Sequence, residues 1–439
     1  MMKNLFKTIS NCFFLFHATW IILTELFLYL LFRNFDTFID RITTKLSNIN
    51  ILYVKTFQAF ALNNCLIDDS INNKLMKFTD TAPWTYSDID PDTLFKLEDK
   101  YNLQFENGHE PINSGMISLV FLASKKISRE KIIIKMKRQN IEEKLEIAIE
   151  KLLFFVYLLS FIPFVSKYQI AEVIYKNISL IQHQINFETE VQNMITMKNN
   201  CKNLKYVKIP TVFPEITSKF SNVIMMEYIE GLTISKVLKE DYENFAKQVV
   251  KFGVVTTAIH GFSHGDLHAG NILFIKDECD LTHKHKIGVL DFGITYETDK
   301  HFRDVFFGLI GDIFVSPSDD IAERLLNSGI IEPIEIIQNL PRLHYNNIIE
   351  LLSKIIHDVI HTSKQATQLK MYKFLSAFNL YMKDNKLTEL GLKPSDNFVK
   401  TQLSLAMSHG ITLTLCKDDY MLVMDKVVNE LFHTDMLKD

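Results

Sequence analysis

The sequence has no excess of positive charge. Its 439 residues include 48 Lys and Arg against 52 Asp and Glu, which gives a formal net charge of -4 and a pI near 6.4. Proteins that bind nucleic acid through their charge usually concentrate basic residues in one region. Here the basic residues are spread along the chain, so the composition disfavours nucleic acid as a partner.

Cysteine is sparse, and no C-x-x-C pair occurs. An odd number of widely separated cysteines fits neither a disulfide framework nor a structural zinc module. We therefore expect the folded part of the chain to occupy a reducing compartment. The five positions are Cys12, Cys65, Cys201, Cys279 and Cys416.

One long apolar run, "CFFLFHATWIILTELFLYLLF", extends from Cys12 to Phe32. It is close to the roughly 20 residues of a membrane-spanning helix. Its Phe, Leu and Ile residues favour insertion by roughly 0.3 to 0.6 kcal/mol each, whereas Glu25 opposes it by roughly 2.5 to 3.5 kcal/mol and His17 adds to this opposition. We interpret residues 1–33 as a membrane-associating segment, either a span or anchor, or a helix that packs on the protein or lies in the bilayer interface. The continuous hydrophobicity disfavours a cleaved transit peptide.

The chain has no internal repeat or low-complexity tract, and its length allows two or three units. Helical periodicity over residues 34–105 predicts an all-helical N-terminal extension. In residues 106–230, "GMISLVFLAS" and "KIIIKMK" predict a β-hairpin, and helical patterns return at 142–200. Within that insertion, "LLFFVYLLSFIPFV" at 152–165 is too short and too Pro-interrupted to span a membrane, so we expect a buried or interfacial helix.

Residues 231–439 are predicted to be mostly helical. The strand "NVIMMEYIEG" comes just before them, and a long helix then leads into the polar segment "HGDLHAGNILF" at 264–274. Two strands, "NILFI" and "KIGVL", flank a polar loop. From Lys300 to the end of the chain the pattern is consistent with helices separated by short Pro, Asn and Gly turns.

The segment "HGDLHAGNILF" carries the first sign of chemistry. Asp266 and Asn271 are five residues apart, which is the spacing of a catalytic base and a magnesium ligand in a kinase loop. Asp291 of "LDFG" follows a strand 20 residues beyond Asn271, so a hairpin can return it beside the loop. Carboxylate and amide oxygens suit magnesium, and Asp266 would act as the base or orient the acceptor.

Phosphoryl transfer also needs a cation on the phosphates. Lys135 lies on the second strand of the predicted hairpin, where such a lysine pairs with nucleotide phosphates. Its carboxylate partner should lie on the next packed helix, and Glu190 in "NFETEVQNM" is preferred over Glu188. Taken singly, Lys135 would be a solvated strand lysine and Glu190 an ordinary helix acid.

The loop before the hairpin, "PINSGMISLVF", lies where phosphates are expected. It offers Ser114, Gly115 and Met116 as nucleotide-binding residues. Its single glycine cannot by itself make the usual phosphate cradle.

A zinc site is the alternative interpretation of His264, Asp266 and His268. The segment has the character of a loop, and no fourth ligand has suitable spacing, since Cys279 and "HKH" lie in a polar turn. We therefore expect His264 to brace the loop and His268 to support the metal or the phosphates.

From about residue 50 to 330, the ordered motifs resemble those of the UbiB family of atypical protein-kinase-like proteins, which is linked to ubiquinone biosynthesis. "VKTFQ" stands where the family has K-x-G-Q, "FTDTAP" where it has a leucine, an aspartate and a proline, and "PINSGMISLVF" where it has an alanine-rich loop. "IIIKMKRQNI" resembles V-A-V-K-V-Q-R-P-G-I, and "FETEVQN" resembles the E-x-x-N helix. "MEYIEG" is similar to the hinge, and "HGDLHAGN" with "LDFG" to the catalytic pair. Several motifs are weak alone, but in this order they are highly specific.

The resemblance implies an α+β, two-lobed protein-kinase-like fold with an all-helical N-terminal extension over the nucleotide cleft and a helical insertion in the N-lobe. It implies membrane association and an ATPase activity with ATP and Mg²⁺ as cofactors. Lys55 and Gln58 would belong to a regulatory extension, and Glu227 of the hinge would join the nucleotide-binding residues.

The sequence departs from the family pattern at two places. Phe57 replaces the signature glycine of K-x-G-Q. In the alanine-rich loop Asn113, Gly115 and Met116 replace small residues, and Leu119 replaces a glutamine. Nucleotide preference and regulation by the extension are left open by these changes.

Two other functions are compatible with the motifs. An aminoglycoside or choline phosphotransferase also carries H-G-D-x-H-x-x-N and a metal-binding aspartate, but it lacks a "VKTFQ" helix. A pseudokinase or scaffold would bind nucleotide without turnover. The altered loop and Phe57 favour it, whereas the full set of chemical residues opposes it: Lys135, Asp266, Asn271 and Asp291.

The segment after "LDFG" bears on the acceptor. Protein kinases build a peptide platform from a long segment that ends in A-P-E. Here "DFGITYETDKHFRDVFFGL" enters an apparent helix within about ten residues, and no A-P-E follows. We therefore expect a small or lipid-like acceptor, or water. The resemblance to the UbiB family further implies a role in quinone or lipid metabolism at a membrane.

Overall fold

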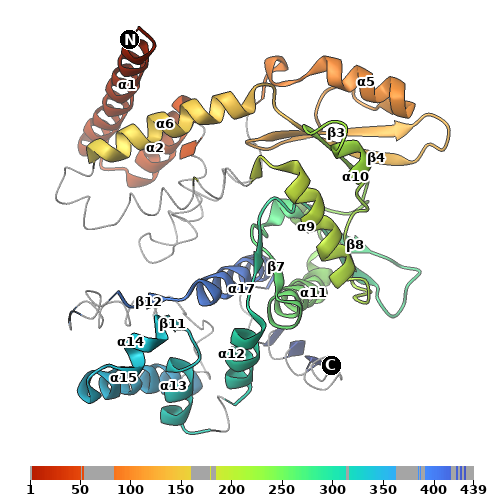
Figure 1. The fold of residues 1–439 in the computed structure, drawn as a ribbon. Coiled ribbons are helices and arrows are strands. Elements are labelled where there is room, and N and C mark those ends of the chain that lie inside the picture. The colour runs from red at the N-terminus through yellow and green to blue at the C-terminus, as the bar shows by residue number, and fades with distance from the viewer. Residues whose placement is uncertain are drawn as a thin grey trace. The chain divides into compact units, whose positions relative to one another are not determined.

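The structure is a computed structural model, drawn as a ribbon in Figure 1. The chain divides into two compact units. The first comprises Met1–Val191 and Val212–Tyr228, and the second comprises Gln192–Thr211 and Ile229–Asp439. The residues described are 2–50, 52–53, 84–159, 178, 184–312, 316–361, 384, 386, 391–416, 422–423, 426–427 and 430–431.

A five-stranded antiparallel sheet forms one part of the first unit, with strand order β1-β3-β4-β6 and β2 paired to β3. The predicted hairpin is confirmed, because Val120 of β3 lies opposite Lys135 of β4. Alternate side chains point to opposite faces, and Phe121 and Ile134 share a buried cluster with Leu94 of helix α5. The elements are α5 (Pro91–Tyr101), β1 (Leu103–Phe105), β2 (Asn113–Ser114), β3 (Ser118–Lys125), β4 (Lys131–Lys137), α10 (Pro214–Thr217) and β6 (Val223–Glu227), with a 3-10 turn at Tyr86–Asp88.

The other part of the first unit is helical. Helices α1 (Met2–Phe32) and α2 (Phe35–Ile49) are separated by two residues, and the Asn34 side chain caps α2 by accepting a hydrogen bond from the Thr37 N–H at 3.0 Å. Both α2 and α6 (Ile141–Leu159) contact α1 (Figure 1). Helix α9 (Phe187–Asn200) begins in the first unit and continues into the second.

Two small sheets and a long helix form the core of the second unit. The predicted strands β8 and β9 pair antiparallel, with Ile272 opposite Val289. The long helix predicted before the segment 264–274 is α-helical only to Val254. Its last turn is a π-helix that is capped by Gly261, whose φ is +65°. The elements are β5 (Val207–Lys208), α11 (Tyr242–Val254), the π-helix (Val255–His260), β7 (Phe262–His264), β8 (Ile272–Lys276), β9 (His285–Val289), β10 (Thr295–Glu297) and α17 (Asp396–Leu415), with 3-10 turns at Ile234–Lys236, Lys239–Asp241 and Ala269–Asn271.

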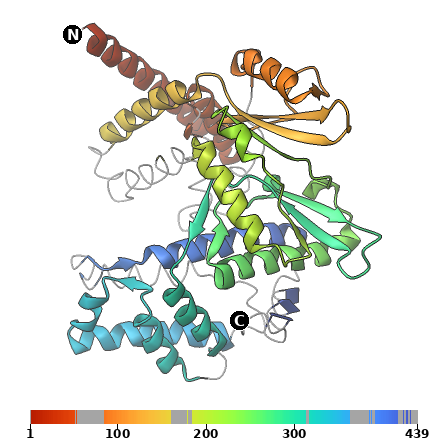
Figure 2. The same cartoon turned by 45° about the vertical axis from the view of Figure 1, so that its right-hand side comes forward.

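The remaining helices of the second unit share a separate apolar cluster that includes Phe306, Ile321 and Leu352. Figure 2 shows these helices from a second direction. Most elements after Lys300 are helices, and one short strand pair lies among them, in which β11 (Ile331–Glu332) pairs with β12 (Lys393–Pro394). Pro333 and Pro394 lack the amide hydrogen that a helix interior needs. The helices are α12 (Lys300–Asp312), α13 (Ser318–Leu326), α14 (Ile334–Gln338) and α15 (Arg342–His361).

Several expected features lie outside the described residues. They include "VKTFQ" with Lys55, Phe57 and Gln58, the segment 70–80, and the last part of 152–165. The four-part division of the chain stays a prediction. The four cysteines within the described ranges are free thiols.

Candidate active site

The first unit carries a buried ion pair between Lys135 and Glu190. Strand β4 places Lys135 between strands β3 and β6, and Glu190 lies in the first turn of α9. The Lys135 Nζ atom is 2.7 Å from Glu190 Oε1, and the two residues are 7% and 1% exposed. Glu188, the rival partner, is exposed to solvent. The structure thus brings together the lysine and the preferred carboxylate.

The loop expected to cover the phosphates is held by backbone contacts. Ser114 ends β2 and is buried, and the Gly115 N–H donates to the Ser118 carbonyl at 2.8 Å. Met116 is 8% exposed, and its side chain packs in the apolar cluster that also contains Leu46 of α2 and Leu145 of α6. Glu227 is the last residue of β6.

Arg138 supports this loop and was not singled out from the sequence. Its Nε and Nη2 donate to the Gly115 carbonyl at 3.0 and 2.7 Å, and its Nη1 donates to Asp88 Oδ2 at 2.9 Å. Burial alone would raise the pKa of Asp88, but hydrogen bonds from Lys144 and from the Thr85 backbone, with the charge of Arg138, hold this pKa below its ordinary value. The available signal was a third basic residue directly after "KMK".

His264 fixes the start of the loop between β7 and β8 in the second unit, residues 264–271, called the catalytic loop below. Its Nε2 is 3.0 Å from the Leu290 carbonyl, and its Nδ1 accepts a hydrogen bond from the Asp266 N–H at 3.1 Å. Burial lowers the pKa of His264, which is 2% exposed. One neutral tautomer, protonated at Nε2, satisfies both contacts. The structure therefore places His264 where it braces the loop.

Asn271 is anchored on two sides. Its Nδ2 donates to the Asp266 carbonyl at 2.9 Å, and its own carbonyl accepts from the Leu290 N–H at 2.8 Å. Because the amide nitrogen is used within the loop, the amide oxygen is the atom that a hard cation would bind. His268 accepts from the Gly270 N–H at 3.1 Å and so caps the turn Ala269–Asn271.

Asp291 has a left-handed backbone, with a φ of +57°, which is uncommon for a residue other than glycine. Its Oδ1 accepts from the Gly293 N–H at 3.2 Å. The next residue, Phe292, is fully buried, and its carbonyl accepts from Asn193 Nδ2 at 2.9 Å. The Phe292 ring lies 5.1 Å from the His264 ring. The conformation of Asp291 is thus held by contacts on its C-terminal side, one of them from the asparagine of "FETEVQN".

Tyr296 is a further residue near the loop that the sequence interpretation missed. It lies on β10 opposite Ser263 of β7. Burial, with the negative charge of Asp266, raises the pKa of Tyr296 to about 12. The phenol is therefore protonated at neutral pH and can donate a hydrogen bond.

The donor set suits magnesium better than zinc. Among the residues that the structure describes, no group of three or more His, Cys, Asp or Glu side chains could hold a metal. Both ring nitrogens of His264 are engaged within the loop. Asp291 and Asn271 offer two oxygen ligands, and magnesium in phosphate-binding sites is held by one or two carboxylates plus phosphate and water.

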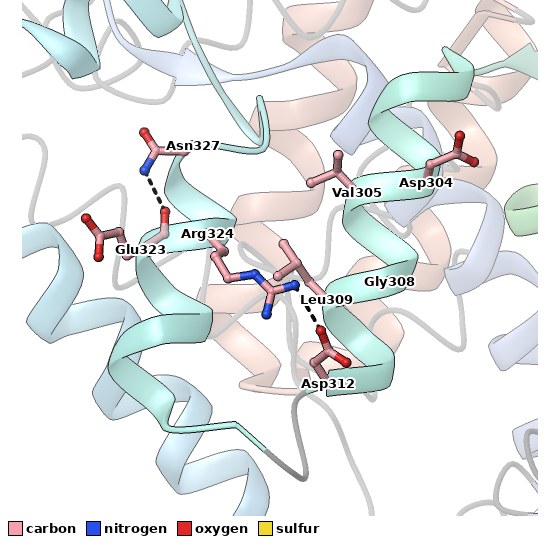
Figure 3. A pocket seen from close by; sticks show the side chains of 8 residues that line it. All are labelled: Asp304, Val305, Gly308, Leu309, Asp312, Glu323, Arg324 and Asn327. Atoms are coloured by element: carbon pink, nitrogen blue, oxygen red, sulfur yellow. Dashed lines mark hydrogen bonds and ion pairs between the residues drawn. The ribbon is translucent and has the colours of Figure 1, made fainter.

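A groove of about 640 Å³ lies between α12 and α13 (Figure 3). None of the motif residues lines it. Arg324 points across the groove and is already paired with Asp312 at 2.9 Å and Asp320 at 3.5 Å. This groove therefore contains none of the candidate site residues.

Comparison with known sequences identifies relatives. The model of the ABC1 atypical kinase-like domain matches residues 89–325, more than half of the chain. The probable protein kinase UbiB of Shewanella woodyi is 25% identical over 309 residues, covering 67% of this chain and 54% of the relative. The probable serine/threonine-protein kinase abkB of Dictyostelium discoideum is 26% identical over 317 residues, covering 66% and 44%. The chain thus spans about half or less of the length of these relatives.

Among solved structures the matches are of low similarity. The Rv3197–erythromycin complex from Mycobacterium tuberculosis has a TM-score of 0.47 and 14% identity, covering 82% of this chain and 87% of that one. The Rio2 kinase–ADP/Mg²⁺–phosphoaspartate complex from Chaetomium thermophilum has a TM-score of 0.28 and 12% identity, covering 75% and 96%. The predicted α+β, kinase-like fold class is confirmed by the family match. The chain belongs to the ABC1 family of atypical kinase-like proteins, to which the UbiB kinases are related.

Proposed function

We propose that the protein binds Mg²⁺–ATP and either hydrolyses it or transfers its γ-phosphate to a small or lipid-like acceptor. The buried Lys135–Glu190 pair is the observation that carries this proposal. Burying two charges requires a large desolvation energy, so apolar residues of similar size could fill the same space without loss of folding free energy. A buried lysine that is paired with a carboxylate is therefore a candidate functional group.

The remaining roles are proposed from the motif residues of each unit taken by itself. Asp291 and Asn271 would hold the magnesium ion, which neutralises phosphate charge when it is bound. Asp266 would accept the proton of the acceptor or orient it, and Lys135 would contact the phosphates. His264 and Tyr296 contribute by fixing the loop and by placing a protonated phenol near Asp266.

The short segment after Asp291 supports a small acceptor. Helix α12 begins at Lys300, and three of the intervening residues, Thr295–Glu297, are paired with β7. Little free chain is left on which a peptide could lie. We therefore expect hydrolysis or transfer to a small or lipid-like molecule, with no appreciable phosphorylation of proteins in trans.

The test is a radiolabelled ATP assay on the purified chain, with and without liposomes and with a peptide library. Asp291→Asn should weaken Mg²⁺-dependent ATP binding by at least roughly tenfold, because a neutral amide is a poorer ligand for a hard dication. The matched control is Asp304→Asn, an exposed carboxylate that pairs with Lys300. Unchanged Mg²⁺–ATP affinity in Asp291→Asn would contradict the metal assignment. Efficient peptide labelling by the wild type would contradict the acceptor assignment.

A non-catalytic member of the family is the second candidate, and the position of Met116 favours it. Its side chain fills the core where the family pattern has a small loop residue. The same assay separates the two functions. Tight Mg²⁺–ATP binding without turnover, both with and without liposomes, would establish a pseudokinase.

We also propose that the protein works at a membrane. The described residues contain one helix that is long and apolar enough to cross a bilayer, Ser10–Phe32, with a mean hydropathy of 1.8. A lipid surface beside the chain would give it access to a lipid-like acceptor.

A further inference from the structure

Helix α1 presents an uncharged apolar face to solvent. Residues three or four positions apart lie on one side of a helix, and six large side chains follow this spacing. Each is between 53% and 70% exposed. Glu25 is the only charged residue between Ser10 and Phe32. This outward face consists of Phe13, Phe16, Trp20, Leu23, Phe27 and Leu30.

The opposite face of α1 is bound to the protein itself. Phe14 and Ile21 are buried in a cluster that includes Leu46 of α2 and Leu145 of α6. Ala18, on the same side of the helix, is fully buried. One face of helix α1 is therefore part of the core of the first unit, and only the other face is exposed to solvent.

Polar contacts hold this inner face at both ends. Glu25 is 1% exposed, and its carboxylate lies 3.0 Å from Arg41 Nε and 2.6 Å from Lys45 Nζ. Toward the N-terminus, Asn11 Nδ2 donates to Glu150 Oε1 of α6 at 3.0 Å. The charge that opposes insertion is thus neutralised by the protein and faces away from the apolar surface.

These contacts are incompatible with a helix surrounded by lipid. Since Glu25 contacts Arg41 and Lys45, helix α2 runs back along α1, and it carries Asp36 and Asp40 as well. If α1 crossed the hydrocarbon, these four charged residues of α2 would enter it too, or the buried ion pairs would break. Both outcomes cost several kcal/mol.

We infer that α1 docks side-on onto a lipid bilayer, with its outward face in the headgroup and acyl boundary of one leaflet and Glu25 still paired inside the protein. A lipid surface fits better than a protein partner, because helices that pair in water carry charged residues beside the apolar seam, and the outward face has none. Basic residues also flank the run at Lys3, Lys7 and Arg33, which favours anionic lipid. The inference extends the proposed membrane location and is independent of phosphoryl transfer.

The depth of Trp20 tests this orientation. The chain has two tryptophans, so Trp84→Phe leaves Trp20, near the middle of Ser10–Phe32, as the only tryptophan. The full-length variant is mixed with liposomes of phosphatidylcholine and phosphatidylglycerol that carry bromine at defined acyl positions. We expect the strongest quenching from shallow bromines, since a side-on helix sits about 5–10 Å into the boundary. Strongest quenching from bromines near the chain ends would show a spanning helix, and absence of quenching would show that lipid does not bind this face.

Substitutions on the outward face test the surface itself. Phe16→Ser and Phe27→Ser should each weaken vesicle partitioning about tenfold, because each removes a large apolar side chain from the contact. The matched control is Leu281→Ser in the second unit, where the leucine is 90% exposed; it should leave partitioning unchanged.

Sedimentation without lipid distinguishes the other occupant. A dimer that Phe27→Ser converts to a monomer, with no flotation of the wild type, would replace the bilayer by a second copy of the chain. Mg²⁺–ATP binding by the same variants, measured in detergent, separates a failure of this inference from a failure of the proposed catalysis. These residues are outside the catalytic set, so nucleotide affinity should match that of the wild type.

Discussion

Removal of one member of the Lys135–Glu190 pair should destabilise the first unit strongly. At the observed 2.7 Å, the gross attraction is about 6 kcal/mol at an effective dielectric constant of about 20. Much of this is offset by desolvation in the intact protein, but a single substitution leaves the other charge buried without its partner. We therefore expect Lys135→Met or Glu190→Met to lower the free energy of unfolding by about 3–5 kcal/mol. The double variant should recover most of that loss, because neither charge is then buried.

The measurement is urea unfolding followed by fluorescence. Trp84 is packed against the sheet core of the first unit, so Trp20→Phe leaves a single reporter of that unit. The four proteins of the cycle, namely the parent, two single variants and the double variant, give the coupling energy between the two side chains.

An exposed pair of similar length supplies the control. Lys125 Nζ is 2.8 Å from Glu130 Oε2, but these side chains are 40% and 51% exposed. Lys125→Met should cost about 1 kcal/mol or less, because solvent screens an exposed pair. If Lys135→Met and Glu190→Met cost no more than this control, burial does not make the pair special, and the main support for the proposed function is lost.

Two further predictions concern the second unit. Burial lowers the pKa of His264, so the folded protein binds fewer protons there than the unfolded chain, whose histidines titrate near about pH 6.5. The stability that neutral His264 contributes is therefore complete above about pH 6.5 and lost as pH falls through the folded pKa. The midpoint of urea unfolding should fall more steeply on acidification in the wild type than in His264→Gln. Parallel pH profiles of the two proteins would contradict this prediction. Gly261→Ala should destabilise the second unit by more than about 1 kcal/mol, because φ is +65° and a Cβ would lie 1.4 Å from Arg303 Nη1. In contrast, a Cβ added at Gly308 would meet no atom within 4 Å, so Gly308→Ala should stabilise α12 by about 0.5–1 kcal/mol. Both variants are measured by urea unfolding followed by circular dichroism. A loss of stability in Gly308→Ala equal to that in Gly261→Ala would contradict the prediction.

Local features of the site were readable in the sequence. The β3–β4 hairpin places Lys135 because strand alternation and the polar turn are properties of neighbouring residues. Another hairpin, β8–β9, brings the residue before Asp291 to Asn271, since the Leu290 N–H donates to the Asn271 carbonyl at 2.8 Å. The π-helix before Gly261 was missed, because the apolar pattern of a helix does not reveal where one extra residue enters a turn.

Choices between similar residues depended on contacts across long stretches of sequence. Glu190 and Glu188 both lie in the first turn of α9, and only the rotation of that helix against β4 decides which one is buried. Arg138 reaches Asp88, 50 residues away, and no local pattern joins them.

Glu25 shows most clearly the difference between what the sequence determines and what the tertiary structure decides. The sequence by itself determined a long apolar helix and one charge that opposes insertion. Only the tertiary structure decided that this charge is buried and paired with Arg41 and Lys45 on the next helix. The physical reason is that hydrophobicity is a sum over neighbouring residues, whereas the free energy of a buried charge depends on which groups the fold brings within hydrogen-bonding distance.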